Sequence, residues 1–360
     1  MPIASPSEIS REVDRAFFLI GGVGVLLLLG ITAAMIFFVL KYRRERVTHT
    51  AQIEGHLLLE ITWIVIPTII VVWFFFVGYR GFGMMRAVPE DAMEVRVTGR
   101  QWSWSFYYPD EKVSAAEMVV PVNTPVKVSL TAPPNDVLHS FYIPDFRVKE
   151  DVIPGRDTYL WFTSERTGVF NVFCAEFCGK DHAKMITKLR VVSEEEYRDW
   201  LRAMIMKRFK PLEYQAVIDP QHPAFGPEDL NIDAKTLYAT YCASCHGVNG
   251  DGSGLPGLAR SFLTDQNWKR SPKVTDIYRT LMEGIDGTQM RAYPDFTPWE
   301  KMALAHHVRS FQATPPPADT EEDFNALVAA YELDKIQGPK ERIAIEAAME
   351  ILLREAGTIP

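Results

Sequence analysis

The stretch CAEFCGKDHAKM, residues 174–185, places two cysteines, a histidine and a methionine on one short segment. His139 lies upstream of it. Soft sulfur ligands together with imidazole nitrogen select copper, zinc or iron–sulfur centres, and a thioether beside thiolates and histidines on a β-sandwich favours copper. The segment, together with His139, therefore predicts a copper site.

Two simpler structures would use part of this segment. Cys174 and Cys178 would form a disulfide in an oxidising compartment, with His182 and Met185 as ordinary loop residues. A type I blue-copper site would need only one of the two cysteines. The second thiolate favours a dinuclear centre, and so many ligand types at this spacing argue against a disulfide.

The other two cysteines stand in CASCH, residues 242–246. This sequence has the form of a c-type haem attachment motif, in which Cys242 and Cys245 make thioether links to the porphyrin and His246 becomes an axial iron ligand. A zinc site is the alternative, but the chain has no second Cys or His pair at zinc-finger spacing to complete one. We therefore expect a covalent haem.

The sixth ligand of the haem iron is expected to be a methionine downstream of this motif, which leaves Met282, Met290 and Met302. Met282 falls in an expected helix, Asp276 to Glu283, and Met302 falls in the final expected helix of the domain, so both are explained as core residues. Met290 follows the flexible sequence Gly287-Thr288-Gln289. Met290 is therefore the predicted ligand.

Two apolar runs near the N-terminus, Ala16 to Leu40 and Leu57 to Tyr79, are each long enough to cross a bilayer. A cleavable signal peptide is the alternative for the first run, but its polar, mixed-charge lead and its length disfavour this. The cationic cluster KYRRER, residues 41–46, separates the runs and is typical of a cytoplasmic loop. Both termini are then expected outside, in the periplasm or an equivalent oxidising space.

The chain is expected to contain three folded parts. Residues 1–91 form the N-terminal segment and the transmembrane hairpin. Residues 92–192 show alternating apolar positions between turns, which predicts a small β-sandwich or barrel. Residues 193–231 are expected to form a helical segment and a linker, and residues 232–313 a small helical domain. Residues 314–360 form an acidic, partly helical tail, for which a solvated or subunit-contacting helix is expected.

Charge and cysteine usage limit the partners. The chain has 360 residues and a formal net charge of -8, which argues against a nucleic-acid partner and suits a basic, soluble redox partner. All four cysteines fall into two tight pairs, and each pair lies beside a histidine. This grouping indicates metal or haem chemistry.

The copper segment resembles the CuA site of cytochrome oxidase subunit II. The sequences QWSW, residues 101–104, and DVLHSF, residues 136–141, support the resemblance, which covers residues 16–192. It implies an all-β, cupredoxin-like Greek-key sandwich in which two copper ions share both cysteine sulfurs. The implied ligands are the side chains of His139, Cys174, Cys178, His182 and Met185 and the backbone carbonyl of Glu176.

The resemblance implies roles for three more side chains. Trp102 would be the aromatic residue through which electrons enter CuA, although buried tryptophans usually belong to the core. The Glu176 carboxylate would hold a magnesium ion at the interface with subunit I. Glu60, in the first turn of the second expected helix, matches the glutamate at the mouth of a proton pathway into subunit I; a snorkelling interfacial acid is the alternative.

The C-terminal domain resembles an all-α, class I cytochrome c with one covalent haem c. The whole chain is then similar to subunit II fused to a cytochrome c domain, as in caa-type haem-copper oxidases. Arg291 follows Met290 where a proline is common in that family, which is a departure from its pattern. The glycine-rich run Gly250 to Gly257 is expected to wrap the haem edge; a plain surface turn is the alternative.

This resemblance implies electron input to a respiratory terminal oxidase. An outer donor, either a soluble cytochrome c or a quinol-oxidising complex, would reduce haem c, which reduces CuA, which reduces subunit I. Oxygen would be reduced to water in subunit I with proton pumping, because this chain lacks the intramembrane histidines of a haem-copper centre. The implied partners are oxidase subunits I and III in the bacterial inner membrane, with both redox domains on the periplasmic side.

Three other functional classes share some of these sequence features. Nitrous oxide reductase also uses CuA, but the eight histidines of this chain cannot supply its catalytic copper cluster. The CuA-containing small subunit of a nitric oxide reductase is an open alternative, because the difference would lie in the partner subunit. A free-standing membrane-anchored electron carrier or a copper-delivery protein is the other alternative, although Glu60 and the Glu176 carboxylate would then have no evident task.

Overall fold

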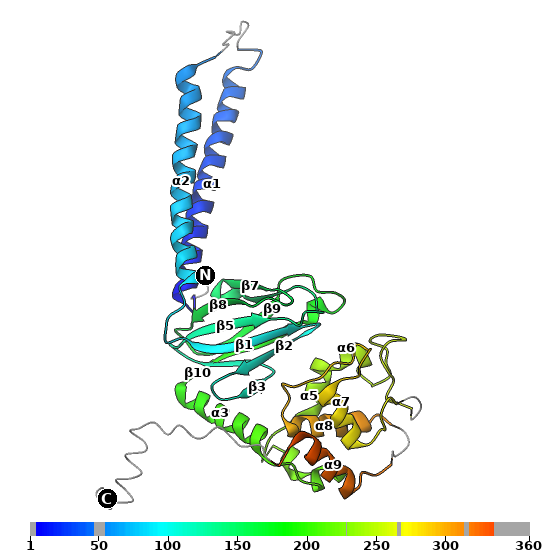
Figure 1. Ribbon diagram of the computed structural model, residues 1–360. Coiled ribbons are helices and arrows are strands. Elements are labelled where there is room, and N and C mark those ends of the chain that lie inside the picture. The colour runs from blue at the N-terminus through cyan, green and yellow to red at the C-terminus, as the bar shows by residue number, and fades with distance from the viewer. Residues whose placement is uncertain (1–4, 47–54, 228, 265–267, 313–316, 335–360) are drawn as a thin grey trace, which may run out of the picture. The chain divides into compact units, whose positions relative to one another are not determined.

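The computed structural model of the chain describes residues 5–46, 55–227, 229–264, 268–312 and 317–334 (Figure 1). The chain divides into two compact units. The first consists of Met1–Trp104 with Glu117–Glu194, and the second of Ser105–Ala116 with Glu195–Pro360. Two long helices, a β-sandwich and a group of short helices follow one another, as the sequence predicts.

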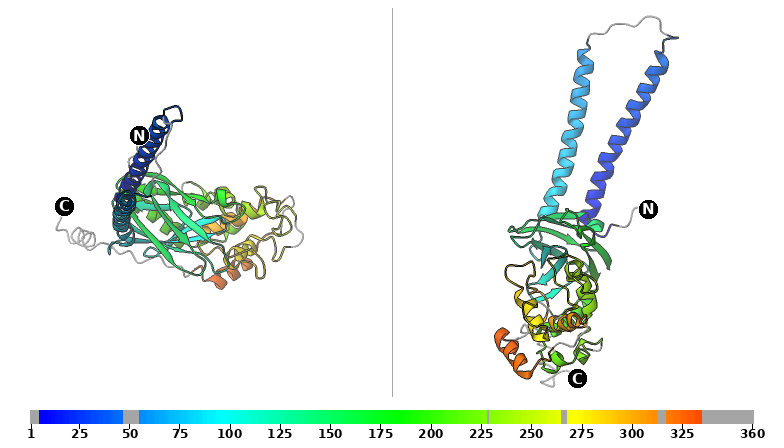
Figure 2. Two further views of the ribbon diagram at one scale, coloured as in Figure 1. Left: turned by 90° about the horizontal axis from the view of Figure 1, so that it is seen from above. Right: turned by 90° about the vertical axis from the view of Figure 1, so that its right-hand side faces the viewer.

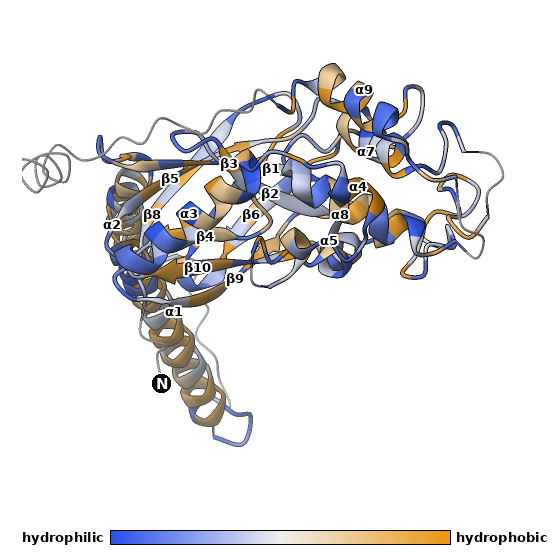
Figure 3. Cartoon of the chain, turned by 90° about the horizontal axis from the view of Figure 1, so that it is seen from below, coloured by the Kyte–Doolittle hydropathy of each residue, from blue (hydrophilic) through white to orange (hydrophobic). Residues whose placement is uncertain are grey.

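The predicted membrane spans are two long helices, α1 (Glu8–Lys41) and α2 (Leu57–Arg86). Both contain the predicted runs and extend beyond them. They pair as a hairpin (Figure 2), and most of their length is coloured as hydrophobic (Figure 3). Each is long and apolar enough to cross a membrane, and their apolar side chains are exposed. Such helices suit lipid, because they satisfy their own backbone hydrogen bonds.

The start of α1 and the end of α2 are attached to the β-sandwich. Arg11 donates two hydrogen bonds of 2.7 Å to Glu165, and Arg86 donates one of 2.6 Å to Glu150. Ile9, which precedes the predicted span, is 2% exposed. The beginning of α1 is therefore part of the folded β-domain, which favours a permanent anchor over a cleaved signal peptide.

The sandwich consists of two five-stranded sheets, ordered β3-β2-β1-β5-β8 and β4-β10-β9-β6-β7. In each sheet one pair is parallel, β1 with β5 and β10 with β4. The strands are β1 (Met93–Arg100), β2 (Ser103–Tyr108), β3 (Val113–Ala115), β4 (Met118–Pro121), β5 (Pro125–Thr131), β6 (His139–Ile143), β7 (Val148–Val152), β8 (Thr158–Thr163), β9 (Gly168–Cys174) and β10 (Ile186–Val192). Short 3-10 helices, Pro144–Phe146 and His182–Lys184, interrupt the connections.

Alternation along the strands produces the core of the sandwich. Val95 and Val97 of β1 pair with Val128 and Leu130 of β5, and none of the four is more than 1% exposed. Every second residue of a strand points to the same face, so these four side chains share the buried face. The alternation predicted from the sequence is confirmed.

The second unit is mainly helical. Its helices are α3 (Glu194–Phe209), α4 (Gln215–Ile218), α5 (Ala234–Tyr241), α6 (Ala243–His246), α7 (Val274–Glu283), α8 (Pro298–Arg309) and α9 (Glu321–Tyr331), with a 3-10 turn at Pro223–Phe225. Trp299, Tyr238 and Tyr278 are the largest fully buried side chains of these helices. The helical segment predicted within residues 193–231 corresponds to α3, and the described residues of 232–313 form helices and loops, as predicted.

Two segments pack differently from the prediction. The expected linker contributes five buried residues to the helical core: Leu212, Ala216, Val217, Ala224 and Leu230. The described part of the tail, 317–334, is also attached, because Phe324 and Leu327 of α9 are buried in the same core. Both segments mix apolar residues with proline and acidic residues, which hid their buried positions in the sequence. The rest of the tail, 335–360, lies outside the described residues.

Candidate metal centre and haem attachment site

The predicted copper-binding residues come together from neighbouring strands. His139 begins β6 and Cys174 ends β9, and these strands are paired, with Phe141 opposite Cys174. The loop from β9 to β10 carries the other predicted side-chain ligands, Cys178, His182 and Met185. Strand pairing therefore brings His139 to the cysteine loop.

The predicted donor atoms surround two free thiols. The sulfurs of Cys174 and Cys178 are 3.8 Å apart, well beyond the length of a disulfide bond. On one side, the Cys174 sulfur lies 3.9 Å from His139 Nδ1 and 3.2 Å from the carbonyl oxygen of Glu176. On the other side, the Cys178 sulfur lies 3.5 Å from His182 Nδ1 and 3.8 Å from Met185 Sδ. This set of thiolates, imidazoles and a thioether fits copper.

The pKa values of the two buried, neighbouring thiols shift in opposite directions. His139, Cys174 and Cys178 are all buried. The hydrogen bond between the sulfurs lowers the pKa of Cys174 and raises the pKa of Cys178, because a second negative charge beside the first is unfavourable. Both thiolates are therefore favoured only when a cation is bound between them.

Asp136 orients His139. His139 Nε2 lies 3.1 Å from Asp136 Oδ1, so Nδ1 faces the sulfurs. Although burial opposes it, the hydrogen bond to His139 lowers the pKa of Asp136. A carboxylate on the far nitrogen fixes the tautomer and ring orientation of a metal-binding histidine. Our sequence interpretation gave Asp136 no role; its position three residues before His139 was the available signal.

The structure separates the two tryptophans of the QWSW sequence. Trp104 is 2% exposed, and its ring contacts the rings of His139 and Phe141 edge-on, as a core residue. Trp102 is only half-buried, and its Nε1 donates a 3.1 Å hydrogen bond to the carbonyl oxygen of Cys178. Trp102 therefore contacts the ligand loop directly, and its role in electron entry stays a prediction.

The structure gives less information on the predicted roles of the two acids, Glu176 and Glu60, than on the copper ligands. Glu176 offers its backbone carbonyl to the cysteine cluster, and its side chain is half-buried. Glu60 lies in the first turn of α2, where its Oε1 accepts a 3.2 Å hydrogen bond from the backbone N–H of His56. Such a contact stabilises the start of a helix. The magnesium and proton-pathway roles stay predictions.

The haem motif forms a short helix, α6, with both cysteines free and half-exposed. His246 Nδ1 donates a 3.0 Å hydrogen bond to the carbonyl oxygen of Arg260, which leaves Nε2 for iron. Burial lowers the pKa of His246, and this favours the neutral imidazole that binds a metal. These residues fit covalent haem attachment.

The glycine-rich run folds back onto the haem motif. The N–H of Gly252 donates to the carbonyl of His246 at 2.8 Å, and that of Leu255 to the carbonyl of Cys245 at 2.9 Å. A Cβ on Gly254 would lie 2.3 Å from the carbonyl oxygen of Ser244. The loop is therefore more than a surface turn, because it fixes the backbone of the attachment helix.

Of the three methionines predicted as sixth-ligand candidates, Met290 alone lies outside a helix. Met282 is in α7, and Met302 is in α8 with its side chain 0% exposed. Met290 is half-buried against the helical core, and its carbonyl accepts a 2.7 Å hydrogen bond from the N–H of Ile285. The structure is compatible with Met290 as ligand and explains Met302 as core.

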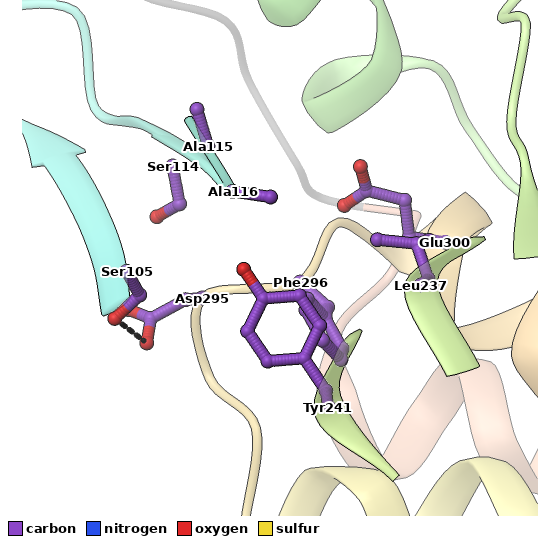
Figure 4. A pocket seen from close by; sticks show the side chains of 9 residues that line it. All are labelled: Ser105, Ser114, Ala115, Ala116, Leu237, Tyr241, Asp295, Phe296 and Glu300. Carbon is purple, nitrogen blue, oxygen red and sulfur yellow. Dashed lines mark hydrogen bonds between the residues drawn. The ribbon is translucent and has the colours of Figure 1, made fainter. Parts of the chain in front are cut away.

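A small pocket within the second unit is a poor substrate site (Figure 4). Its volume is about 20 Å³, roughly that of a site for one water molecule. Ser105 donates a 3.1 Å hydrogen bond to Asp295 at its wall. Its lining consists of Ser105, Ser114, Ala115, Ala116, Leu237, Tyr241, Asp295, Phe296 and Glu300. This pocket is therefore too small to bind an organic substrate.

Comparison with known proteins agrees with this geometry. Three family models match in order: "Cytochrome C oxidase subunit II, transmembrane domain" over residues 4–80, "Cytochrome C oxidase subunit II, periplasmic domain" over 113–192, and "Cytochrome c" over 232–312. The cytochrome c oxidase subunit 2 of Alkalihalophilus pseudofirmus is 31% identical, over 80% of this chain and 84% of that protein. The chain belongs to the cytochrome c oxidase subunit 2 family.

Other members of the family are similar over shorter stretches. The cytochrome c oxidase subunit 2 of Cereibacter sphaeroides is 32% identical, over 48% of this chain and 69% of that protein. Among solved structures, the periplasmic domain of subunit II of cytochrome oxidase from Bradyrhizobium japonicum is 39% identical and covers 34% of this chain and 99% of that one, with a TM-score of 0.32.

Membership of the cytochrome c oxidase subunit 2 family confirms the predicted fold class. The chain is a two-pass membrane protein in which a cupredoxin-like domain precedes a cytochrome c domain. It is an electron-input subunit of a haem-copper oxidase, and so part of an oxidoreductase. Its two extramembrane domains imply copper and haem c as cofactors.

Proposed function

We propose that this subunit holds two copper ions at its cysteine loop and one covalent haem c at its CASCH motif, and that it passes electrons from an outer donor to subunit I. The observation that carries the proposal is the grouping of four further donor atoms around two free thiols 3.8 Å apart. A disulfide between Cys174 and Cys178 would not explain why four further donor atoms surround the two sulfurs.

The distribution of the donors favours two metal ions over one. His139 Nδ1 and the Glu176 carbonyl lie against the Cys174 sulfur, whereas His182 Nδ1 and Met185 Sδ lie against the Cys178 sulfur. If both sulfurs are shared, each of two copper ions can have both sulfurs and two of the remaining four donors. One ion would leave part of this donor set unused.

The protein contributes positioning and exclusion of water. Three of the ligands, His139, Cys178 and Met185, are no more than 2% exposed, and the paired strands β6 and β9 fix the first two ligand segments. Copper and haem c, when bound, supply reversible one-electron chemistry. A rigid donor set keeps the structural change on reduction small.

At the second site, Cys242 and Cys245 would hold haem c through thioether bonds, with His246 and Met290 as axial ligands. The Arg260 carbonyl orients His246, and the loop that contains Gly252 fixes the motif backbone. A thioether ligand raises the potential of the haem. Such a potential suits electron transfer from a respiratory donor.

The remaining assignments concern partners and orientation. We place both redox domains in the periplasm, with subunits I and III in the membrane and a soluble cytochrome c or a quinol-oxidising complex as donor. Trp102, through its contact with Cys178, is the proposed point at which electrons reach the copper loop. Glu176 is the proposed magnesium ligand at subunit I, and Glu60 the proposed start of a proton pathway.

The test uses two variants of the intact oxidase. One carries Cys178→Ser in this subunit, and the control carries Thr167→Ala, at an exposed position of the same domain. With a reduced donor, Cys178→Ser is expected to accumulate reduced haem c and to lose oxygen consumption, whereas the control keeps both. Unchanged oxygen consumption in Cys178→Ser would overturn the proposal. Nitric oxide consumption without oxygen consumption in the unaltered complex would assign the subunit to a nitric oxide reductase.

A further inference from the structure

The turn between β1 and β2 contacts both segments that carry copper ligands. The side-chain amide of Gln101 donates a 2.7 Å hydrogen bond to the carbonyl oxygen of Cys178. The backbone N–H of Gln101 donates a 3.3 Å hydrogen bond to Asp136 Oδ2, and Asp136 Oδ1 in turn holds His139 Nε2. One residue thus links the His139 segment to the Cys178 segment.

The Cys178 carbonyl accepts a second hydrogen bond from the same turn. Trp102 Nε1 donates to it at 3.1 Å. A carbonyl oxygen has two lone pairs and accepts two donors without conflict. The carbonyl adjacent to a bridging sulfur is therefore held from two directions by consecutive residues, Gln101 and Trp102.

The residue after Cys178 leaves room for this contact. Gly179 has a φ of +115°, a backbone conformation that residues with a side chain rarely adopt. A Cβ at this position would lie 3.0 Å from Nε2 of Gln101 and 3.3 Å from the ring of Trp102. Any side chain at Gly179 would push the turn away from the loop. The close approach of turn and loop is therefore built into the backbone.

We propose that Gln101 is a positioning residue of the copper centre, which holds the Cys178 segment in fixed register with the Asp136–His139 segment. This inference rests on the proposed dinuclear site. Gln101 is exposed, so it contributes little to the buried core. Its replacement should change the geometry and retention of copper while leaving the fold intact.

The experiment uses the full-length chain in detergent, loaded with copper, with the variants Gln101→Ala, Gln101→Glu and Gln101→Lys. Glutamate keeps the shape but removes the side-chain donor, whereas lysine restores an N–H donor at similar reach. Gln221→Ala, at an exposed position of the second unit, is the control. The measurements are copper per chain, the copper hyperfine pattern in electron paramagnetic resonance, and the rate of copper loss to a chelator.

Loss of a partner that orients a metal ligand typically weakens metal binding about tenfold or more. We expect Gln101→Ala and Gln101→Glu to lose copper about tenfold faster and to alter the hyperfine pattern. The rate of copper loss and the hyperfine pattern of Gln101→Lys should be closer to those of the unaltered chain. Gln221→Ala should match the unaltered chain in both. Thermal unfolding of the metal-free chain should be the same for all.

Three outcomes would overturn the inference, and they are distinguishable. Variants with the unaltered hyperfine pattern and copper retention would refute the role of Gln101 and leave the dinuclear site standing. Equal loss of copper retention and of metal-free thermal stability would make Gln101 a folding residue. Absence of two coppers in the unaltered chain would refute the proposed function itself, and this inference with it.

Discussion

At the residue scale, the haem site depends on which atoms are free to bind iron. The Arg260 carbonyl takes the Nδ1–H of His246, and the ring of Phe262 stacks on the imidazole with centroids 4.4 Å apart. The ring is therefore held in place, and its Nε2 would be available to haem iron. Met290, which lies outside a helix, is the proposed second ligand of the haem iron.

Replacement of Met290 tests this assignment. Met290→Ala should lower the reduction potential of haem c and abolish the methionine-to-iron absorption band, because a thioether axial ligand raises the potential. Met282→Leu, in α7, is the matched control and should change neither. Both quantities can be measured by spectroelectrochemical titration of the full-length chain. Loss of the band in Met282→Leu would move the assignment away from Met290.

The candidate metal and haem ligands could be proposed from the sequence, but their supporting contacts could not. Cysteine, histidine and methionine at fixed spacing indicate metal chemistry before any fold is known. The role of Gln101 depends on a turn that strand pairing brings to Cys178, and the role of Arg260 on a backbone carbonyl, which every residue has. Such contacts leave no pattern in the residue types.

At the scale of elements, one buried acid, Asp319, helps to attach the described part of the tail to the haem domain. Asp319 accepts hydrogen bonds from the N–H groups of Val274 and Thr275 at 2.9 and 3.0 Å, at the start of α7. It also pairs with Arg309 of α8 at 3.2 Å, and its side chain is 0% exposed. A carboxylate at a helix start satisfies free N–H groups and stabilises the helix. Asp319 therefore joins α7, α8 and the tail.

Asp319→Asn should lower the free energy of unfolding of the haem domain by about 3 kcal/mol, because it leaves Arg309 without its buried charge partner. Chemical unfolding of the full-length chain, followed by the haem Soret band, measures this change. Asp286→Asn, at an exposed position, should change the free energy by less than about 0.5 kcal/mol. Equal effects of the two substitutions would show that the tail is not part of the cooperative domain.

The sequence predicted which elements exist more reliably than where their domains end. Long apolar runs predict α1 and α2, and alternating apolar residues predict β1. A helix in lipid and a strand in a half-buried sheet each require a regular apolar pattern. The segment 211–231 has no such period, and its buried side chains are few and separated. Its packing onto the helical core followed from tertiary contacts alone.

At the scale of the whole molecule, the paired helices define two sides of a membrane. Hydrogen bonds from Arg11 to Glu165 and from Arg86 to Glu150 attach the beginning of α1 and the end of α2 to the same β-domain. The connection at the other ends of the helices includes Arg43, Arg44 and Arg46. Cationic loops are retained in the cytoplasm. This arrangement supports a periplasmic β-domain.

Labelling with a membrane-impermeant maleimide tests the orientation. A cysteine introduced by Asp157→Cys, at an exposed position of the β-domain, should react in intact spheroplasts. A cysteine introduced by Arg44→Cys should react only in inverted vesicles. The unaltered chain controls for its native cysteines. The reverse pattern would place the redox domains in the cytoplasm and contradict the proposed donor.

The most direct test of the central claim is the metal content and electron paramagnetic resonance spectrum of the oxidised full-length chain. Two coppers and one covalent haem per chain, with one unpaired electron shared equally by both coppers, is the predicted result. A single copper, or no copper and a disulfide between Cys174 and Cys178 in metal-replete protein, would contradict the account.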